Sequence, residues 1–517
     1  MPTYLSPGVY VEEVEAGSRP IEGVGTAVAA FVGFAAQGPF NTATLVSNWG
    51  QYVKTFGDFA DGCYLGHAVY GYFLNGGGNC YVVRVGGARG DDGGRAALSA
   101  RPQAVVGPYR VLAKELAAGR GNSGGGSGDL SIEVANATGD DATDDQFVLT
   151  VKQGGRVVET HNVSTKRGKD NVVTVVRERS NLITVELVEG ATVARPGKAS
   201  VVLATPAPTP PTPRQVATDD YVGDVADRTG FGGLEAIDEV TMVAVPDLMS
   251  AYKSGMVDME TVKAVQLAMI AHCELMGDRM AIIDPPPGLS PQQVREWRMD
   301  LAGYDSKYAA MYYPWIKVFD PTSGTNTYVP PSGHMAGVWA RNDASRRVHK
   351  APANEVVRGT VSLETSLTRA EQELLNPIGV NCVRAFPGRG IRVWGARTLS
   401  SDPAWRYLNV RRLFNYLEES ILNGTQWVVF EPNDDALWAR IRRTIASFLV
   451  TEWRKGALFG LTPDEAYYVR CDRETNPAES IDAGQVTCEI GIAPVKPAEF
   501  VVFRLAQFSG GTSLVSE

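Results

Sequence analysis

The chain has 517 residues, 44% of them hydrophobic and 21% charged, so it can bury the cores of about three domains. Its formal net charge of −9 at pH 7 argues against bulk attraction to nucleic acid or to an anionic membrane surface. The cysteines include no Cys-x-x-Cys pair, which is typical of reduced cysteines in a cytoplasmic protein. No secretory signal is visible, since Glu12 and Glu13 stand where basic residues are expected, and no apolar run reaches the ~20 residues that span a bilayer.

Both ends of the chain carry short runs with the composition of β-strands. The first run contains Val9, Tyr10, Val11 and Val14, and the last contains Val501, Val502, Phe503 and Leu505. Chain ends usually fray unless something pairs with them, and strand addition to a neighbouring sheet is a known mode of linkage. We therefore expect residues 1–20 and 499–517 to be arms that are exchanged between subunits. This pattern predicts an assembly protein.

The middle of the chain differs in composition from its flanks. From about residue 86 to 221 it contains no tryptophan, and it is rich in glycine and in alternating strands such as residues 147–151 and 182–187. It ends in a proline-rich run at residues 205–213, which predicts a stiff, extended linker. We interpret residues 89–220 as a β-rich domain that is inserted into another domain and displayed on the surface.

The flanks of this insertion have the pattern of one interrupted domain. A strand at residues 81–85 precedes it, and a strand at 240–245, a helix at 260–276 and a strand at 280–283 follow it. The last three form a βαβ unit, which implies a parallel sheet covered by helices. We expect residues 21–88 and 221–349 to form a discontinuous α/β middle domain.

The last part of the chain predicts an α+β domain over residues 350–498. Asp402-Pro403 is a typical helix start, and the apolar spacing that follows ends at Asn423-Gly424. A strand at residues 428–430, a helix starting at Asp434-Asp435 and a half-buried strand at 486–492 are expected next. The predicted fold class is therefore multidomain α/β (α+β) with an inserted β-rich domain.

Asp247 and Asp284 are the best candidates for catalysis. Both follow strands of the βαβ unit, at the end of the sheet where α/β enzymes place their sites. The alternative is that they terminate strands in turns, beside Pro246 and Pro285. No phosphate-binding loop and no histidines at metal-ligand spacing accompany them, so we predict no catalytic, metal or cofactor site. A hydrolase-like enzyme using the two acids, and an adhesin displaying the inserted domain, stay open as alternatives.

Basic residues gather at residues 341–350, at 389–397 and on the helix after Asp434. They are ordinary solvated helix faces or a surface that binds an acidic partner, and the sequence allows both. On the last helix we single out Arg440, Arg443, Arg454 and Lys455.

Eight strings along the chain resemble, in order, those of contractile tail sheath proteins. They are PTYLSPGVYVEE at residues 2–13, NGGGNCYVVRV at 75–85, PPSGHMAG at 330–337, KAPAN at 350–354, LNPIGVN at 375–381, VWGARTL at 393–399, YLNVRRL at 407–413 and FEPND at 430–434. The likeness covers roughly residues 1–88 and 235–517 and leaves out the insertion.

The resemblance implies a structural subunit, not an enzyme, of a phage tail, a tailocin or a phage-tail-like contractile injection system. In this family, copies stack as hexameric discs in a helical homopolymer around an inner tube, which makes the protein itself, the tube, the baseplate and the terminal cap the expected partners. Nucleic acid binding and membrane insertion are not expected.

The family's architecture carries over as further expectations. The C-terminal domain lies against the tube, so Arg440, Arg443, Arg454 and Lys455 become candidates for facing it. The inserted domain points outward, and the terminal arms complete a small sheet in neighbouring copies. Assembly is expected in the bacterial cytoplasm, with release by lysis and a contraction that drives the tube through a target membrane.

Overall fold

The computed structural model describes residues 20–86, 103–114, 130–137, 143, 145–166, 168–188, 193–203 and 216–505. The chain divides into two compact units. Residues 87–212 form one unit, and the chain before and after them forms the other.

An eight-stranded sheet is the centre of the larger unit, in the order β18-β17-β13-β12-β11-β1-β3-β2. Its strands are β1 (Ala29–Gly33), β2 (Thr44–Val46), β3 (Cys80–Arg84), β11 (Met242–Ala244), β12 (Met280–Ile283), β13 (Ala309–Tyr313), β17 (Val380–Phe386) and β18 (Gly390–Val393). From β17 to β3 all neighbours are parallel, and β18 and β2 are antiparallel edge strands. β1, β12 and β13 are buried along their whole length, as expected of strands covered by helices on both faces.

The βαβ prediction is confirmed, because β11 and β12 pair in parallel and α8 (Met259–Met276) connects them. Asp258 caps the start of α8, and Gly277 ends the helix in the left-handed conformation. The other helices of this region are α1 (Trp49–Phe56), α2 (Leu65–Asn75), α6 (Thr218–Val222), α7 (Asp247–Lys253), α9 (Pro291–Glu296), α10 (Ser332–Arg346) and α11 (Arg369–Leu375), with short 3-10 or π turns at η1 (Gly232–Ala236), η2 (Trp297–Ala302) and η3 (Asn376–Ile378).

Two glycines of the PPSGHMAG string allow α10 to lie directly against α2. A Cβ atom at Gly333 would stand 2.3 Å from the Cα atom of Ala68, and one at Gly337 would stand 2.4 Å from the carbonyl oxygen of Tyr72. Because real side chains never approach so closely, only glycine fits at these positions. A small sheet of β14 (Ile316–Asp320), β15 (Thr325–Val329) and β16 (Thr360–Leu363) lies in the same unit.

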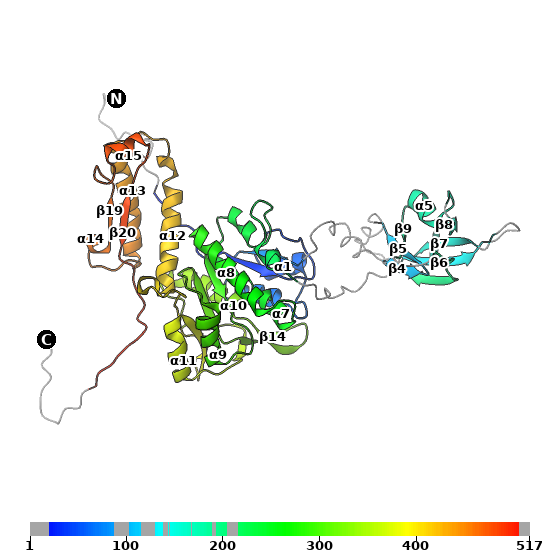
Figure 1. Cartoon of the computed structure of the whole chain (residues 1–517), viewed down its shortest axis with the longest axis horizontal. Helices are drawn as coiled ribbons and strands as arrows, with labels where there is room; N and C mark the ends of the chain where they lie inside the picture. Colours follow the sequence, from blue (N-terminus) through cyan, green and yellow to red (C-terminus); the bar gives the residue numbers. More distant parts are fainter. Residues whose placement is uncertain are drawn as a thin grey trace, which may run out of the picture. The chain divides into compact units, whose positions relative to one another are not determined.

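The elements from residue 403 onward build a second core in the same unit. Its elements are η4 (Pro403–Trp405), α12 (Leu408–Gly424), η5 (Gln426–Val428), α13 (Asp435–Arg454), α14 (Pro463–Ala466), β19 (Tyr467–Arg470), α15 (Ala478–Asp482) and β20 (Glu489–Ile492). Buried side chains of α12 and α13, among them Leu417 and Ile445, share one apolar cluster with Ile21 and Val348 from distant parts of the chain. Figure 1 shows the β19–β20 pair lying along α13.

The unit of residues 87–212 is built from antiparallel strands. Its elements are β4 (Gln103–Val106), β5 (Tyr109–Ala113), β6 (Leu130–Asn136), β7 (Gln146–Gln153), β8 (Arg156–Ser164), α5 (Val172–Arg179), β9 (Ile183–Leu187) and β10 (Ala199–Val202). They form a sheet in the order β10-β6-β7-β8 and another in the order β4-β5-β9. The two sheets and α5 bury a common core that includes Val111, Val151 and Val176. The proline-rich run at 205–213 lies outside the described residues.

Three expectations from the sequence are wrong in detail. The boundary at residues 349/350 cuts the eight-stranded sheet, since β17 and β18 come from beyond it and β17 pairs with β13. The expected strand at 428–430 is not a strand: Val428 ends the 3-10 turn η5, and Val429 and Phe430 belong to the turn that follows. This segment connects α12 to Asp434, which caps α13. Asp402 caps the short 3-10 helix η4, and α12 begins only at Leu408.

Candidate functional surfaces

The two arms differ in what the structure describes. Val9, Tyr10, Val11 and Val14 lie outside the described residues. Val501, Val502, Phe503 and Leu505 are within them, belong to no strand of this chain and are exposed, Leu505 to 98%. Five successive residues that include four apolar side chains are thus left in water, which costs free energy unless another surface covers them.

The two-stranded sheet of β19 and β20 offers an edge for such a segment. The strands pair antiparallel from Tyr467–Ile492 to Arg470–Glu489, and within the described parts of the chain no third strand joins either of them. Two-stranded sheets are marginally stable alone, and an unpaired edge presents free N–H and C=O groups to an incoming strand.

The basic residues of α13 divide into two groups. Arg440 pairs with Glu431 at 2.6 Å and its guanidinium lies 5.0 Å from the ring centre of Trp427, and Lys455 pairs with the buried Glu452 at 2.6 Å. Arg443 and Arg454 are exposed and make no ion pair with any residue that the structure describes. Their spacing of eleven residues places them on one side of the helix, so they are the two cations of this face that are free to meet a partner.

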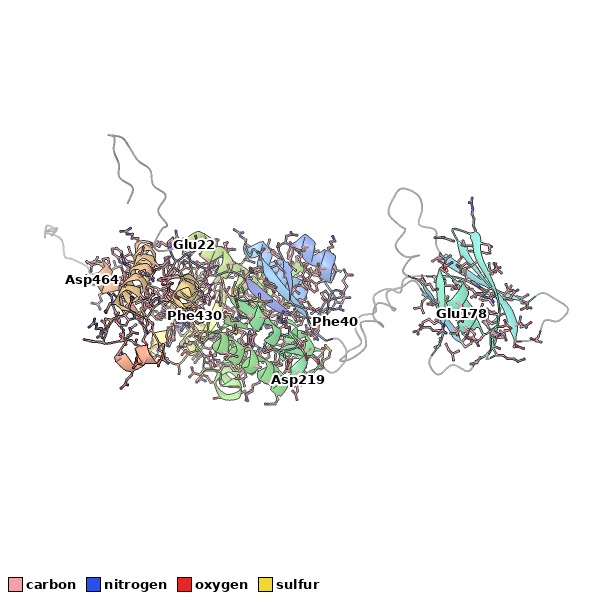
Figure 2. All side chains as sticks on the ribbon, turned by 90° about the horizontal axis from the view of Figure 1, so that it is seen from above. Glu22, Phe40, Glu178, Asp219, Phe430 and Asp464 are labelled. Carbon is pink, nitrogen blue, oxygen red and sulfur yellow. The ribbon has the colours of Figure 1, made fainter. Side chains whose placement is uncertain are left out.

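Sequence reasoning missed two apolar loops at the ends of α13. Phe430, before the helix, is fully exposed with φ +67° (Figure 2). Val429 beside it is also exposed. A positive φ is strained for a bulky residue. After the helix, Phe459 and Leu461 are exposed. The FEPND string was the one signal in the sequence for the first loop.

Asp247 is a structural acid. It is fully buried at the carboxyl end of β11 and accepts hydrogen bonds from the backbone N–H groups of Phe34 (2.7 Å), Leu65 (3.2 Å) and Tyr64. The last two belong to the start of α2, so the carboxylate caps that helix. Burial raises the pKa of Asp247 to about 7, against the opposing effect of these hydrogen bonds.

Asp284 has the same role at the next strand. It follows β12 and accepts hydrogen bonds from the N–H (3.0 Å) and hydroxyl (2.5 Å) of Ser332, the first residue of α10. Burial raises the pKa of Asp284 to about 7 as well. Each acid therefore holds one helix to the sheet, and its oxygens are engaged by protein groups, which leaves little for a substrate to bind.

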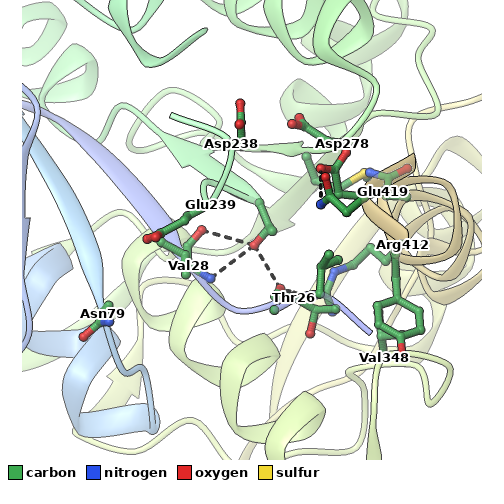
Figure 3. Close-up of a pocket in the computed structure, with 16 residues that line it drawn as sticks. Thr26, Val28, Asn79, Asp238, Glu239, Asp278, Val348, Arg412 and Glu419 are labelled. Carbon is green, nitrogen blue, oxygen red and sulfur yellow. Dashed lines mark hydrogen bonds between the residues drawn. The ribbon is translucent and has the colours of Figure 1, made fainter. Parts of the chain in front are cut away.

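A pocket of about 500 Å³ lies beside α12 at the amino ends of the central strands, the ends away from Asp247 and Asp284 (Figure 3). Asp238, Glu239, Asp278 and Glu419 line it, and the hydroxyl of Thr241 bridges the backbone of Thr26 and Val28 at its floor. Burial, helped by the charges of Asp278 and Asp238, raises the pKa of Glu419.

Among the described residues no three His, Cys, Asp or Glu side chains are grouped to hold a metal ion. None of the helices described is long and apolar enough to cross a membrane.

Comparison with known families accounts for this architecture. The central domain of phage tail sheath proteins matches residues 227–399, and the C-terminal domain of these proteins matches residues 400–508. The chain belongs to the phage tail sheath protein family. The family match includes strands β11, β12, β13, β17 and β18 of the eight-stranded sheet. It also includes helices α12 and α13 and the β19–β20 pair.

Relatives of this sheath protein include the tail sheath proteins of Vibrio phage KVP40 (26% identity over 44% of this chain) and Enterobacteria phage T4 (23% over 71%). The aligned regions span 35% and 57% of those two proteins. Two solved structures are similar over nearly the whole length. The sheath of the extracellular contractile injection system PVC in its contracted state has 24% identity and a TM-score of 0.59, covering 98% of this chain and 99% of that one. The contracted helical sheath of the anti-feeding prophage has 25% identity and a TM-score of 0.59, covering 98% and 100%.

Proposed function

We propose that this protein is the structural subunit of a contractile sheath, which polymerises helically around an inner tube and contracts to drive the tube through a target membrane. The observation that carries the proposal is the coexistence of an exposed apolar arm, residues 501–505, with the open-edged β19–β20 pair. A chain that displays both a free strand and a free edge is suited to join copies of itself.

The arm of one copy adds to the β19–β20 pair of a neighbour in this proposal. A head-to-tail contact of this kind uses two different patches of each subunit, so it generates rings or helices instead of closed dimers. A strand of about five residues contributes about 1 kcal/mol net for each main-chain hydrogen bond, which is modest for one contact but large when summed over a polymer. Arms of this type keep subunits tethered while the rest of their contacts are exchanged in a rigid-body transition.

The first arm, with Val9, Tyr10, Val11 and Val14, supplies the other edge of the same small sheet. The exposed Arg443 and Arg454 bind the tube in the extended state, while Arg440 and Lys455 contribute less because each already has a partner in its own chain. Baseplate and cap proteins terminate the polymer. The likeness to the anti-feeding prophage sheath over the whole length of that chain favours an injection particle, assembled in the bacterial cytoplasm and released by lysis.

Electron microscopy of the purified chain tests the proposal. Long hollow cylinders of uniform diameter are expected. Discrete particles at every protein concentration tried would contradict it. That result would favour the adhesin alternative, which rests on the β-rich unit of residues 87–212.

A further inference from the structure

Glu499 is fixed by a group of side chains immediately before the exposed arm. Arg397 donates to both of its carboxylate oxygens, with Nε at 2.9 Å and Nη2 at 2.6 Å. The Nδ2 atom of Asn376 donates at 2.8 Å and the Tyr407 hydroxyl lies at 3.2 Å. The two-point geometry and the small exposed fraction of Arg397, 9%, make this a strong charge-assisted contact. We call these three residues with Glu499 the clamp.

The clamp is attached to the central sheet. The backbone N–H of Arg397 donates to Asn381 Oδ1 at 2.7 Å, and Asn381 Nδ2 donates to the Arg397 carbonyl at 2.8 Å. Asn381 is a fully buried residue of β17 and is paired with Tyr312 of β13. Glu499 is therefore connected through Arg397 and Asn381 to β17, the strand next to the edge strand β18 of the eight-stranded sheet.

The segment between β20 and the clamp is also held. The Ala493 carbonyl accepts from the N–H of Phe459, and the Ala493 N–H donates to the carbonyl of Ala466. The carbonyl of Val495 accepts from Asn409 Nδ2 at 3.1 Å. From Phe500 to Leu505 all described residues are exposed, and none is in a helix or a strand. Among the described residues, Glu499 is therefore the last whose side chain has hydrogen-bond partners before the exposed arm.

We propose that Arg397, Asn376 and Tyr407 are positioning residues that fix the root of the exchanged arm at Glu499 and so couple the arm to the central sheet. The inference rests on the proposed function, in which residues 501–505 pair with a neighbouring copy. Burial alone would raise the pKa of Glu499, but the hydrogen bonds and the charge of Arg397 outweigh it and hold that pKa below its usual range. The carboxylate is therefore ionised under ordinary conditions, as the clamp requires.

Release of the clamp would lengthen the arm. The last fixed point would become Val495, which frees residues 496–499 and adds about 13 Å of extended chain to the tether. A longer and looser tether lowers the effective concentration of the arm at its acceptor and lets the subunit rotate without moving the arm. Assembly would then need more protein, although the arm itself would be unchanged.

Glu499→Gln is the test variant, because the amide presents a donor to a site that already holds the donors of Arg397 and Asn376. Arg397→Lys removes the two-point contact and keeps the charge. Arg369→Gln is the matched control, since Arg369 forms an exposed ion pair with Glu373 at 3.0 Å in the same region. Two measurements are made on the full chain.

The first measurement is chymotrypsin cleavage of dilute, unassembled protein, followed by mass spectrometry. Cleavage after Phe500 requires the protease to take up Glu499, while cleavage after Phe503 does not. We expect Glu499→Gln and Arg397→Lys to raise the rate at Phe500 about tenfold relative to that at Phe503, since opening of a charged hydrogen-bonded group limits only the first. A loss of stability elsewhere in the fold changes this ratio only if it also opens the clamp, so the Arg369→Gln control should keep the ratio of the unmodified protein.

The second measurement is the lowest concentration at which cylinders form, by light scattering and electron microscopy. We expect it to rise about threefold to tenfold in the two clamp variants and to stay unchanged in Arg369→Gln. An unchanged cleavage ratio, or an altered ratio with unchanged assembly, would overturn the clamp proposal. Failure of the unmodified protein to form cylinders would instead overturn the proposed function, and the cleavage ratio would still report on the clamp.

Discussion

Arg412 of α12 and Asp343 of α10 form a two-point ion pair that is only 4% exposed on either side. Nη1 lies 3.0 Å from Oδ1 and Nη2 lies 2.6 Å from Oδ2, with the Trp339 ring 4.8 Å from the guanidinium. Nη2 also donates to the Thr26 carbonyl at 3.0 Å, and the Thr26 hydroxyl donates to Asp343. This group joins the C-terminal helices to the helix that covers the central sheet.

Breaking the Arg412–Asp343 pair should destabilise the larger unit strongly. Arg412→Met leaves the buried carboxylate of Asp343 without its counter-charge, and Asp343→Asn does the same to the guanidinium of Arg412. We expect either variant to lower the free energy of unfolding by about 3–5 kcal/mol. Urea unfolding followed by tryptophan fluorescence measures it. Arg369→Gln serves as the exposed-pair control, with an expected change of about 0.5 kcal/mol or less. A loss equally small for Arg412→Met would mean that the pair is not the joint we describe.

Deletion of residues 1–14 should leave a folded chain that does not polymerise. The described residues from 20 onward already contain closed cores, so the fold does not depend on the arm in our account. Near-ultraviolet dichroism should be retained and cylinders should be absent. A collapse of the dichroism spectrum would show that this arm packs within its own chain.

Replacement of residues 91–213 by a short Gly-Ser linker should preserve cylinders. The core of the 87–212 unit shares no residue with the apolar cluster around the central sheet, so removing it opens no cavity there. Surface insertions are well tolerated when no buried contacts are lost. If the shortened chain stays monomeric on electron micrographs, the inserted unit takes part in subunit contacts.

The buried acids predict a pH dependence of stability. The pKa values of Asp247 and Asp284 are raised to about 7 in the folded protein, so the folded state keeps protons that the unfolded state releases above about pH 4. Their contribution to stability is therefore full below that pH and is lost as the pH rises through 7. The midpoint temperature of thermal unfolding should therefore decrease as the pH is raised from 5 to 8.

Asparagine at the two acids separates their roles. Asp284→Asn should reduce this slope with little other loss, because the Ser332 hydroxyl can reverse its hydrogen bond. Asp247→Asn places an amide against three N–H donors and should cost about 2 kcal/mol. Neither should affect contraction beyond its effect on stability. If either variant lost an activity while its particles kept their normal architecture, the hypothesis of an enzyme that uses these two acids would be favoured.

The exposed arginines of α13 should hold the extended sheath to its tube. Arg443→Gln with Arg454→Gln should weaken tube binding and its salt sensitivity, each residue by about 1 kcal/mol or less, since exposed charges are screened. Arg440→Gln is the control, because Arg440 already pairs with Glu431. Co-assembly with the tube at increasing salt measures the effect. Unchanged salt sensitivity in the double variant would assign the binding to another segment, such as residues 341–350.

The sequence predicted local features of the fold better than long-range ones. The apolar pattern located β11, α8 and β12, because strand and helix periodicity is written in neighbouring residues. Membership of β17 in the central sheet depends on pairing with β13, some seventy residues earlier, which no local pattern carries. The arginines of α13 could be named from the sequence, but Arg440 could not be separated from Arg443, because its partner Glu431 is nine residues away in a loop.

The clamp could not have been predicted from the sequence. Arg397 was one residue of a basic run, and Glu499 lies 102 residues further along the chain. Only the fold brings them together.

Helical reconstruction of assembled cylinders by cryo-electron microscopy tests the exchange of arms most directly. Our account predicts a four-stranded sheet in every subunit, with residues 9–14 and 501–505 of neighbouring copies paired to the free edges of β19 and β20. Each arm should be continuous with its own chain, the second one leaving at Glu499. A reconstruction in which these edges stay empty, or in which the arms fold back onto their own subunit, would contradict it.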